Sequence, residues 1–183
     1  MIKIAEPAVA LNDHRVGGRI RMSRNLHIRQ DDSRQNIIGA IATVAGGTQG
    51  GRLKSVVLNS HGVPGYLLMG EGFWRPHTEM FQKLNGLVDN IWMTACRIAS
   101  RGGLAPGERL PPNLKGQIGD GYHFCRNIAM NARCNVIASM NDQDVPNRRI
   151  PDGCVDAYEG ALLCFKADGE IAWAHHYALH NGE

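Results

Sequence analysis

The chain has 183 residues, of which 43% are hydrophobic and 20% are charged, and its formal net charge is +3. This length and composition predict one globular domain over residues 1–183 and exclude collagen, coiled coils and wholesale disorder. The net charge is too small to indicate, by itself, a nucleic-acid or membrane partner.

Strands and helices are predicted to alternate along most of the chain, because apolar residues recur at strand or helix spacing between capping residues, glycines and prolines. In chain order, the predicted elements are a strand within 18–28, a helix that starts at 31–33 and ends at Gly46-Gly47, a strand over 53–59, a helix from Pro76 that extends as far as Val88, a strand over 90–95, a helix capped by Asp120, a strand over 135–140 and a hairpin about Asp168-Gly169. This order predicts an α/β fold with a mainly parallel sheet and antiparallel strands from a C-terminal β-hairpin.

The stretch over 97–119 is the longest predicted segment without helix or strand. It has 23 residues, is rich in Gly and Pro, and shows no periodicity. Loops of this length are usually functional or disordered. We expect it to be a substrate-facing or self-cleaved loop.

The five cysteines are odd in number and include no Cys-x-x-Cys pair, so neither a disulfide framework nor a structural zinc site is expected. No metal or cofactor is predicted. Cys125, Cys134 and Cys164 fall within predicted helices or strands and are expected in the core. The start of the sequence lacks a signal-peptide pattern, and no apolar stretch has the length of a membrane span. These features favour a cytoplasmic protein, and export without an N-terminal signal stays open.

His61 and Cys96 are the residues that point to chemistry. His61 lies just beyond the predicted strand 53–59, and Cys96 ends the strand over 90–95. The carboxyl ends of parallel strands meet at one edge of a sheet, so the two side chains are expected to lie together if the strands are neighbours. An imidazole beside a thiol is what a cysteine nucleophile needs. The backbone N–H groups of Gly62 and Cys96 are the predicted donors to an oxyanion.

The two strand ends resemble the caspase-like clan of cysteine peptidases, which includes caspases, metacaspases, legumains, gingipains, separases and bacterial self-processing toxin domains. The resemblance is carried by Val56-Val-Leu-Asn-Ser-His61-Gly62 and by Ile91-Trp-Met-Thr-Ala95-Cys96, and it covers about residues 18–140. Thr94-Ala-Cys-Arg-Ile98 is similar to the caspase signature in its Ala-Cys-Arg centre. The separation of His61 and Cys96, 35 residues, is shorter than the roughly 50 of caspases.

The resemblance implies a caspase-like three-layer sandwich and a cysteine endopeptidase that cleaves a protein or peptide substrate through an acyl-enzyme. His61 would be the general base and acid, Cys96 the nucleophile, and Gly62 with Cys96 the oxyanion donors. No third member of the dyad is implied.

The resemblance also bears on specificity. In caspases and metacaspases, the residue two before the cysteine lines the primary specificity pocket as Gln or Asp; here it is the small, neutral Thr94. Asp142 and Asp144, in the loop after the strand over 135–140, are the candidates to make such a pocket acidic. If the specificity is basic, Arg101 and Arg109 are the candidate sites of self-cleavage.

Two other classes of function remain open. One is a catalytically inactive, caspase-like interaction module. The other is a nucleic-acid-binding α/β protein that uses a cluster of arginines without interleaved aromatic residues: Arg15, Arg19, Arg21, Arg24 and Arg29. A solvated or charge-protected edge strand explains this cluster at least as well. The sequence does not indicate an oligomeric state.

Overall fold

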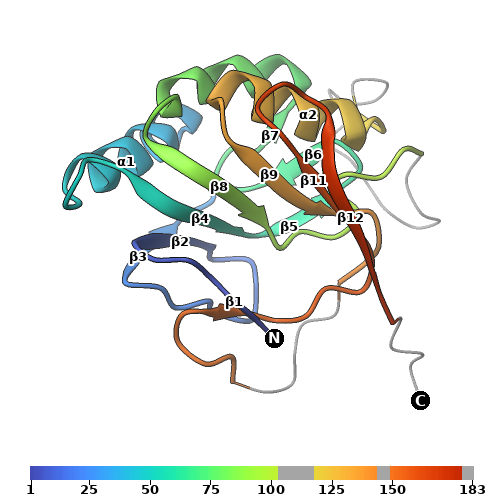
Figure 1. Cartoon of the computed structure of the whole chain (residues 1–183), viewed down its shortest axis with the longest axis horizontal. Helices are drawn as coiled ribbons and strands as arrows, with labels where there is room; N and C mark the ends of the chain where they lie inside the picture. Colours follow the sequence, from blue (N-terminus) through green and yellow to red (C-terminus); the bar gives the residue numbers. More distant parts are fainter. Residues whose placement is uncertain (103–117, 144–148, 179–183) are drawn as a thin grey trace.

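The computed structural model describes residues 1–102, 118–143 and 149–178, and a seven-stranded mixed sheet forms its centre (Figure 1). The order across the sheet is β12-β11-β9-β8-β4-β2-β3. The strands are β2 (Ala8–Asp13), β3 (Arg24–Ile28), β4 (Leu53–Asn59), β8 (Val88–Met93), β9 (Asn135–Ser139), β11 (Gly160–Phe165) and β12 (Ile171–Tyr177). The first five are mutually parallel, and the β11–β12 hairpin continues the sheet in antiparallel fashion. The prediction of an α/β fold with this kind of sheet is confirmed.

β2 is the strand of the central sheet that the sequence prediction missed. All six of its residues are buried, and it pairs on one side with β3 and on the other with β4. A short apolar run that is buried on both faces has no alternation to distinguish it from other buried segments. The predicted strand within 18–28 is real only over Arg24–Ile28, where it is the edge strand β3.

In the part of the chain that the structure describes, three helices flank the sheet. They are α1 (Arg34–Gly46), the 3₁₀ helix η1 (Arg75–Leu84) and α2 (Gly121–Ala132). The predicted caps are confirmed, since Ser33 accepts from the Asn36 N–H and Asp120 from the His123 N–H. The helix predicted near Pro76 is 3₁₀ rather than α, and Val88 belongs to β8 and not to this helix. None of the described helices is long and apolar enough to cross a membrane.

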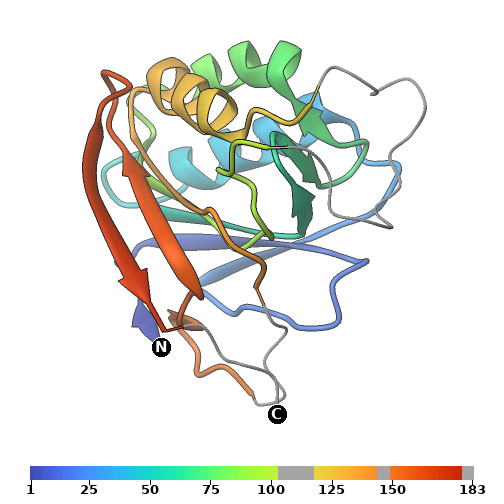
Figure 2. The same ribbon diagram turned by 90° about the vertical axis from the view of Figure 1, so that its right-hand side faces the viewer.

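The described helices all cover the same face of the sheet, as Figures 1 and 2 show. Val9, Leu58 and Ile91 point into the core beneath them. On the opposite face, Ala10, Val57 and Ile137 belong to a second, smaller core. That core is closed by irregular segments and by a two-stranded sheet of β1 (Ile2–Lys3) and β10 (Cys154–Val155). The described residues thus do not confirm the expected three-layer sandwich, because no helix among them covers the second face.

A third sheet follows β4 directly. Its strands are β5 (His61–Val63), β6 (Tyr66–Leu68) and β7 (Phe73–Trp74). β5 and β6 form a tight antiparallel hairpin in which His61 lies opposite Leu68. This hairpin, rather than a simple turn, carries the His-Gly pair at the carboxyl end of the central sheet.

Candidate functional site

The two predicted strand ends meet in one pocket. β4 and β8 are neighbouring parallel strands, with Val56 opposite Ile91. His61 begins the hairpin after β4, and Cys96 follows β8 by three residues. A single pocket at this edge is lined by Val16, Gly18, Ile20, Asn59, Ser60, His61, Thr94, Cys96, Gln143, Ile150, Asp156 and Tyr158. The expectation that His61 and Cys96 share one edge of the sheet is therefore confirmed, and Thr94 lies with them.

Gly62 brings the two segments into contact. A Cβ atom on Gly62 would lie 2.8 Å from the Cβ of Ala95 and 3.4 Å from the carbonyl oxygen of Cys96. Carbon atoms do not approach this closely without displacement of the backbone. The absence of a side chain at Gly62 therefore lets the hairpin lie directly against the Ala95–Cys96 peptide.

The Cys96 thiol is half-buried and in contact with the backbone of Gln143. Its Sγ lies 3.5 Å from the Gln143 carbonyl oxygen, to which the thiol donates, and 3.4 Å from the Gln143 nitrogen. Burial raises the pKa of the thiol above its ordinary value; the Gln143 N–H opposes this, and the Asp142 carboxylate adds to it. The sulfur is therefore a protonated thiol at neutral pH in this arrangement. The next residue, Arg97, has a positive φ of 45°, which is uncommon for a residue with a side chain.

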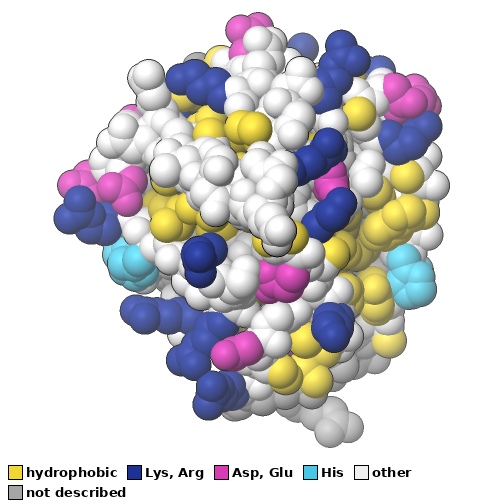
Figure 3. Space-filling view, turned by 60° about the vertical axis from the view of Figure 1, so that its left-hand side comes forward, with side chains coloured by type: hydrophobic (Ala, Val, Ile, Leu, Met, Phe, Trp, Pro, Cys, Tyr) yellow, Lys and Arg dark blue, Asp and Glu magenta, His cyan; other side chains and the backbone are white. Residues whose placement is uncertain are grey.

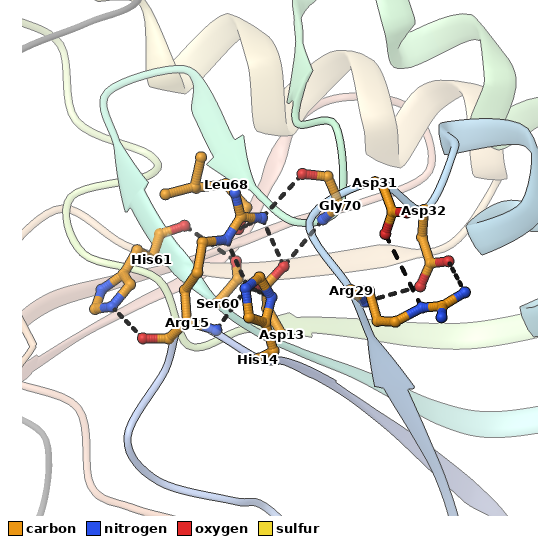
Figure 4. Close-up of polar contacts among 10 residues, drawn as sticks. All are labelled: Asp13, His14, Arg15, Arg29, Asp31, Asp32, Ser60, His61, Leu68 and Gly70. Carbon is orange, nitrogen blue, oxygen red and sulfur yellow. Dashed lines mark hydrogen bonds and ion pairs between the residues drawn. The ribbon is translucent and has the colours of Figure 1, made fainter.

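The imidazole of His61 is exposed and bound to backbone, as Figure 4 shows. Its Nε2 lies 3.1 Å from the carbonyl oxygen of Arg15, in the loop after β2. A carbonyl oxygen only accepts, so Nε2 is the donor in this contact, and Nδ1 is the ring nitrogen left to exchange a proton with a substrate or thiol. Among the contacts of the described residues, none joins this ring to the Cys96 sulfur.

A buried network of amides supports the floor of the pocket. The Asn59 side chain donates to Asn12 Oδ1 and to the Gly18 carbonyl, both at 2.9 Å, and its Oδ1 accepts from Thr94 Oγ1 at 3.0 Å. Asn12 in turn exchanges two hydrogen bonds with the backbone of Ile20. The network joins the ends of β2, β4 and β8 and fixes the loop that forms one wall of the pocket.

Of the two acidic residues predicted for the pocket, Asp142 does not line it and Asp144 cannot be placed. Asp142 has a side chain that is 73% exposed and forms an ion pair with Arg97 Nε at 3.0 Å, and it does not line the pocket. Asp144 lies outside the described residues. Instead, Asp156 is the acidic side chain among the described residues that line the pocket. Sequence spacing gave no signal for it, because Asp156 comes from an irregular segment about 60 residues beyond Cys96.

The candidate residues of the long loop are only partly described. The guanidinium of Arg101 lies 4.1 Å from the ring centroid of Tyr122. Arg109 lies outside the described residues, so its place as a candidate site of self-cleavage stays a prediction. Cys125, Cys134 and Cys164 are buried, which confirms their expected place in the core.

Two of the five N-terminal arginines are paired with carboxylates. Arg15 is paired with Asp13, and Arg29 with Asp31 and Asp32. Figure 3 shows basic side chains spread over one face of the molecule with acidic side chains among them. This distribution gives no specific support to a nucleic-acid surface.

Two polar residues at the end of β2, Asn12 and Asp13, complete the surroundings of the pocket and were missed together with the strand. A signal for them exists in the sequence, because Ala8-Val-Ala-Leu is followed at once by Asn12-Asp13, the same apolar-to-polar change that marks the end of β4.

Comparisons with known proteins give no match to this chain among family models, curated proteins or solved structures. The function of the pocket must therefore be inferred from its geometry and chemistry.

Proposed function

We propose that this chain is a caspase-like cysteine endopeptidase in which Cys96 is the nucleophile and His61 the general base and acid. The observation that carries the proposal is the single pocket that both side chains line, at the carboxyl ends of two adjacent parallel strands. Ligands bind preferentially at that edge of an open α/β sheet. Two residues 35 positions apart in the chain are thus adjacent to one space that a substrate can enter.

The contacts of the two side chains suit general-base catalysis. A scissile carbonyl that enters the pocket displaces the Gln143 contact of the thiol. The proton of Cys96 Sγ passes to Nδ1 of His61, and the sulfur forms a bond to the carbonyl carbon. Nε2 keeps its hydrogen bond to the Arg15 carbonyl, which stabilises the imidazolium that results.

Collapse of the tetrahedral intermediate breaks the C–N bond, and the imidazolium gives its proton to the leaving amine. A water molecule, deprotonated by His61, then hydrolyses the thioester and returns the thiol. The developing oxyanion is held by the N–H groups of Gly62 and Cys96. The register of β5 and β6 supports this role. Val63 and Tyr66 close the turn, and Gly62 with Leu67 forms the next pair. Antiparallel strands exchange hydrogen bonds only at alternate pairs, so a hydrogen-bonded closing pair leaves the N–H of Gly62 available to an oxyanion.

The walls of the pocket favour a basic side chain in the substrate. Ile20, Ile150 and Tyr158 supply apolar surface, and Asp156 supplies a carboxylate. Lys and Arg combine an apolar stem with a cationic end, which matches this combination. The small Thr94 leaves room beside the nucleophile.

Asp156→Asn is expected to reduce kcat/KM for substrates with Arg or Lys before the scissile bond by about 10- to 100-fold, because the charge that attracts the cation is removed. Cleavage after neutral residues should change much less. The effect is measured by comparing the wild type and Asp156→Asn on a peptide library in which the residue before the scissile bond is varied. Asp31→Asn is the matched control, since Asp31 is an exposed carboxylate that lies outside the pocket. Equal losses for basic and neutral substrates would show that Asp156 does not select the cation.

A peptidyl chloromethyl ketone tests the nucleophile directly. We expect a reagent with a basic side chain to alkylate Cys96 and not Cys154, which is also half-buried but lies in β10 outside the pocket. Iodoacetamide, which makes no use of the pocket, should react slowly at pH 7 and faster toward alkaline pH, because burial raises the pKa of the Cys96 thiol. Peptide mapping by mass spectrometry locates both labels. Equal labelling of Cys96 and Cys154 by the peptidyl reagent would contradict the proposal.

A further inference from the structure

Asp13 is a buried carboxylate that the proposed reaction does not use. It is the last residue of β2, and its side chain is fully buried. Oδ1 accepts from the N–H of Arg15 at 3.0 Å and from its Nε at 2.7 Å, and Oδ2 accepts from its Nη2 at 2.7 Å and from the N–H of Gly70 at 2.9 Å (Figure 4). His14 Nδ1 also lies 3.6 Å from Oδ1. This bidentate pair folds the loop after β2 back on the strand that it leaves.

The same guanidinium reaches the hairpin that carries His61. Arg15 Nη2 donates to the Leu68 carbonyl at 3.2 Å and to the Gly70 carbonyl at 2.9 Å. Leu68 is opposite His61 in the β5–β6 pair. The side chain of Arg15 therefore fixes the backbone of the hairpin, while its own carbonyl holds the His61 ring. Asp13 is thus linked through Arg15 both to the strand that pairs with His61 and to the His61 ring.

The charges of this pair persist over a wide pH range. Burial alone would raise the pKa of the Asp13 carboxyl, but the hydrogen bonds from Arg15 and Gly70 outweigh it and hold that pKa below the ordinary value. Asp13 is thus ionised at neutral pH. Removal of one partner from a buried charge pair costs much more folding stability than removal from an exposed pair, since the remaining buried charge is left without compensation.

We propose that Asp13 is a positioning residue for His61, which acts by holding Arg15 so that its carbonyl oxygen fixes the Nε2–H tautomer and the direction of the imidazole. This inference rests on the proposed peptidase function for its kinetic consequence, but not for the structural one. Asp13 itself touches neither substrate nor the reacting sulfur.

Asp13→Asn is expected to lower kcat about 100-fold with KM changed less than about threefold, because a displaced base slows proton transfer, while Asn12 and Asn59 still hold Gly18 and Ile20 in the wall of the pocket. Asp89→Asn is the matched control. Asp89 pairs with Arg52 and Lys54 near the start of β4, at the opposite end of the sheet. Its loss should lower stability but leave kcat unchanged. Steady-state kinetics and thermal unfolding of both variants separate positioning from general destabilisation.

The His61 ring gives a readout that does not depend on activity. In ¹⁵N NMR spectra, assigned by comparison with His61→Gln, the wild-type ring should show Nε2 protonated and Nδ1 unprotonated, and Asp13→Asn should shift both resonances. Arg15→Lys, which keeps the charge but loses the bidentate fork, should shift them in the same direction and serves if Asp13→Asn does not fold. Unchanged ring resonances, or an unchanged kcat in an active enzyme, would overturn the inference. Shifted resonances in a chain that hydrolyses no peptide would uphold the positioning and reject the peptidase.

Discussion

Replacement of Cys96 by alanine is expected to reduce peptide hydrolysis by about 10³-fold or more, because it removes the one thiol among the described residues that line the pocket. The variant should fold normally, since the thiol is only half-buried and its contacts are with the backbone of Gln143. Substrate binding should persist, because the walls of the pocket are unchanged. Hydrolysis of a fluorogenic peptide library and binding of an uncleaved substrate by calorimetry measure the two quantities.

Cys154→Ala is the control for the loss of a partly exposed thiol, and it should retain full activity. The pair of variants also separates the classes of function that the sequence left open. A wild-type chain that binds peptides without cleaving them, with Cys96→Ala equal to it, would identify an inactive interaction module. Activity in Cys96→Ala equal to that of the wild type would assign hydrolysis to another group and reject Cys96 as the nucleophile.

The elements that the sequence predicted well are those with a local cause. Ser33 and Asp120 cap helices whose apolar residues recur at helical spacing, and Asp168-Gly169 occupies a tight turn between two strands. The β4 strand is predicted to the residue, because a run of β-branched and apolar residues lies between polar ones. Each of these signals is complete within about ten residues, so no knowledge of the tertiary fold is needed.

What the sequence did not predict depends on contacts between distant segments. Arg15 belonged to a supposed basic cluster, yet it is bound to Asp13, Leu68 and Gly70. Asp142 has the charge and the loop position that were predicted for an acidic specificity pocket. It is paired with Arg97 instead, and it lies outside the pocket. Charge and loop position could therefore be predicted, whereas the partner of each charge could not, because the partner is set by how the loops fold over the sheet.

The face of the sheet on which the helices pack could not be predicted from the local sequence pattern either. Alternating strands and helices predict crossover helices, but the spacing does not say on which face each helix packs. The small residues Ala8 and Ala10 of β2 face the second core, which loops and short strands close. Ile20, Ile150 and Tyr158 belong to this second core or pack against it, and they also line the pocket. The pocket therefore lies where the loops of the second face meet the ends of the strands. Segments that close the second core thus also supply walls of the candidate site.

Gly62→Ala is the second substitution with a large expected effect. The added methyl group would lie 2.8 Å from the Cβ of Ala95 and 3.3 Å from the carbonyl oxygen of Tyr66, so the hairpin and the Cys96 segment must move apart. We expect a loss of stability of about 1–3 kcal/mol from this overpacking. Activity should fall about 100-fold, since a displacement of about 1 Å between His61 and Cys96 is enough for that.

Gly39→Ala is the matched control for Gly62→Ala, because Gly39 lies within α1 and a Cβ there would meet no atom within 4 Å. In a helix this change should stabilise the chain by about 0.5–1 kcal/mol and leave activity unchanged. Chemical denaturation and peptide hydrolysis measure both effects for the two variants. The decisive comparison is made at a temperature at which Gly62→Ala is fully folded. If its activity there equals that of Gly39→Ala, the contact between the His-Gly hairpin and the Cys96 segment stabilises the fold but does not align the two side chains for catalysis.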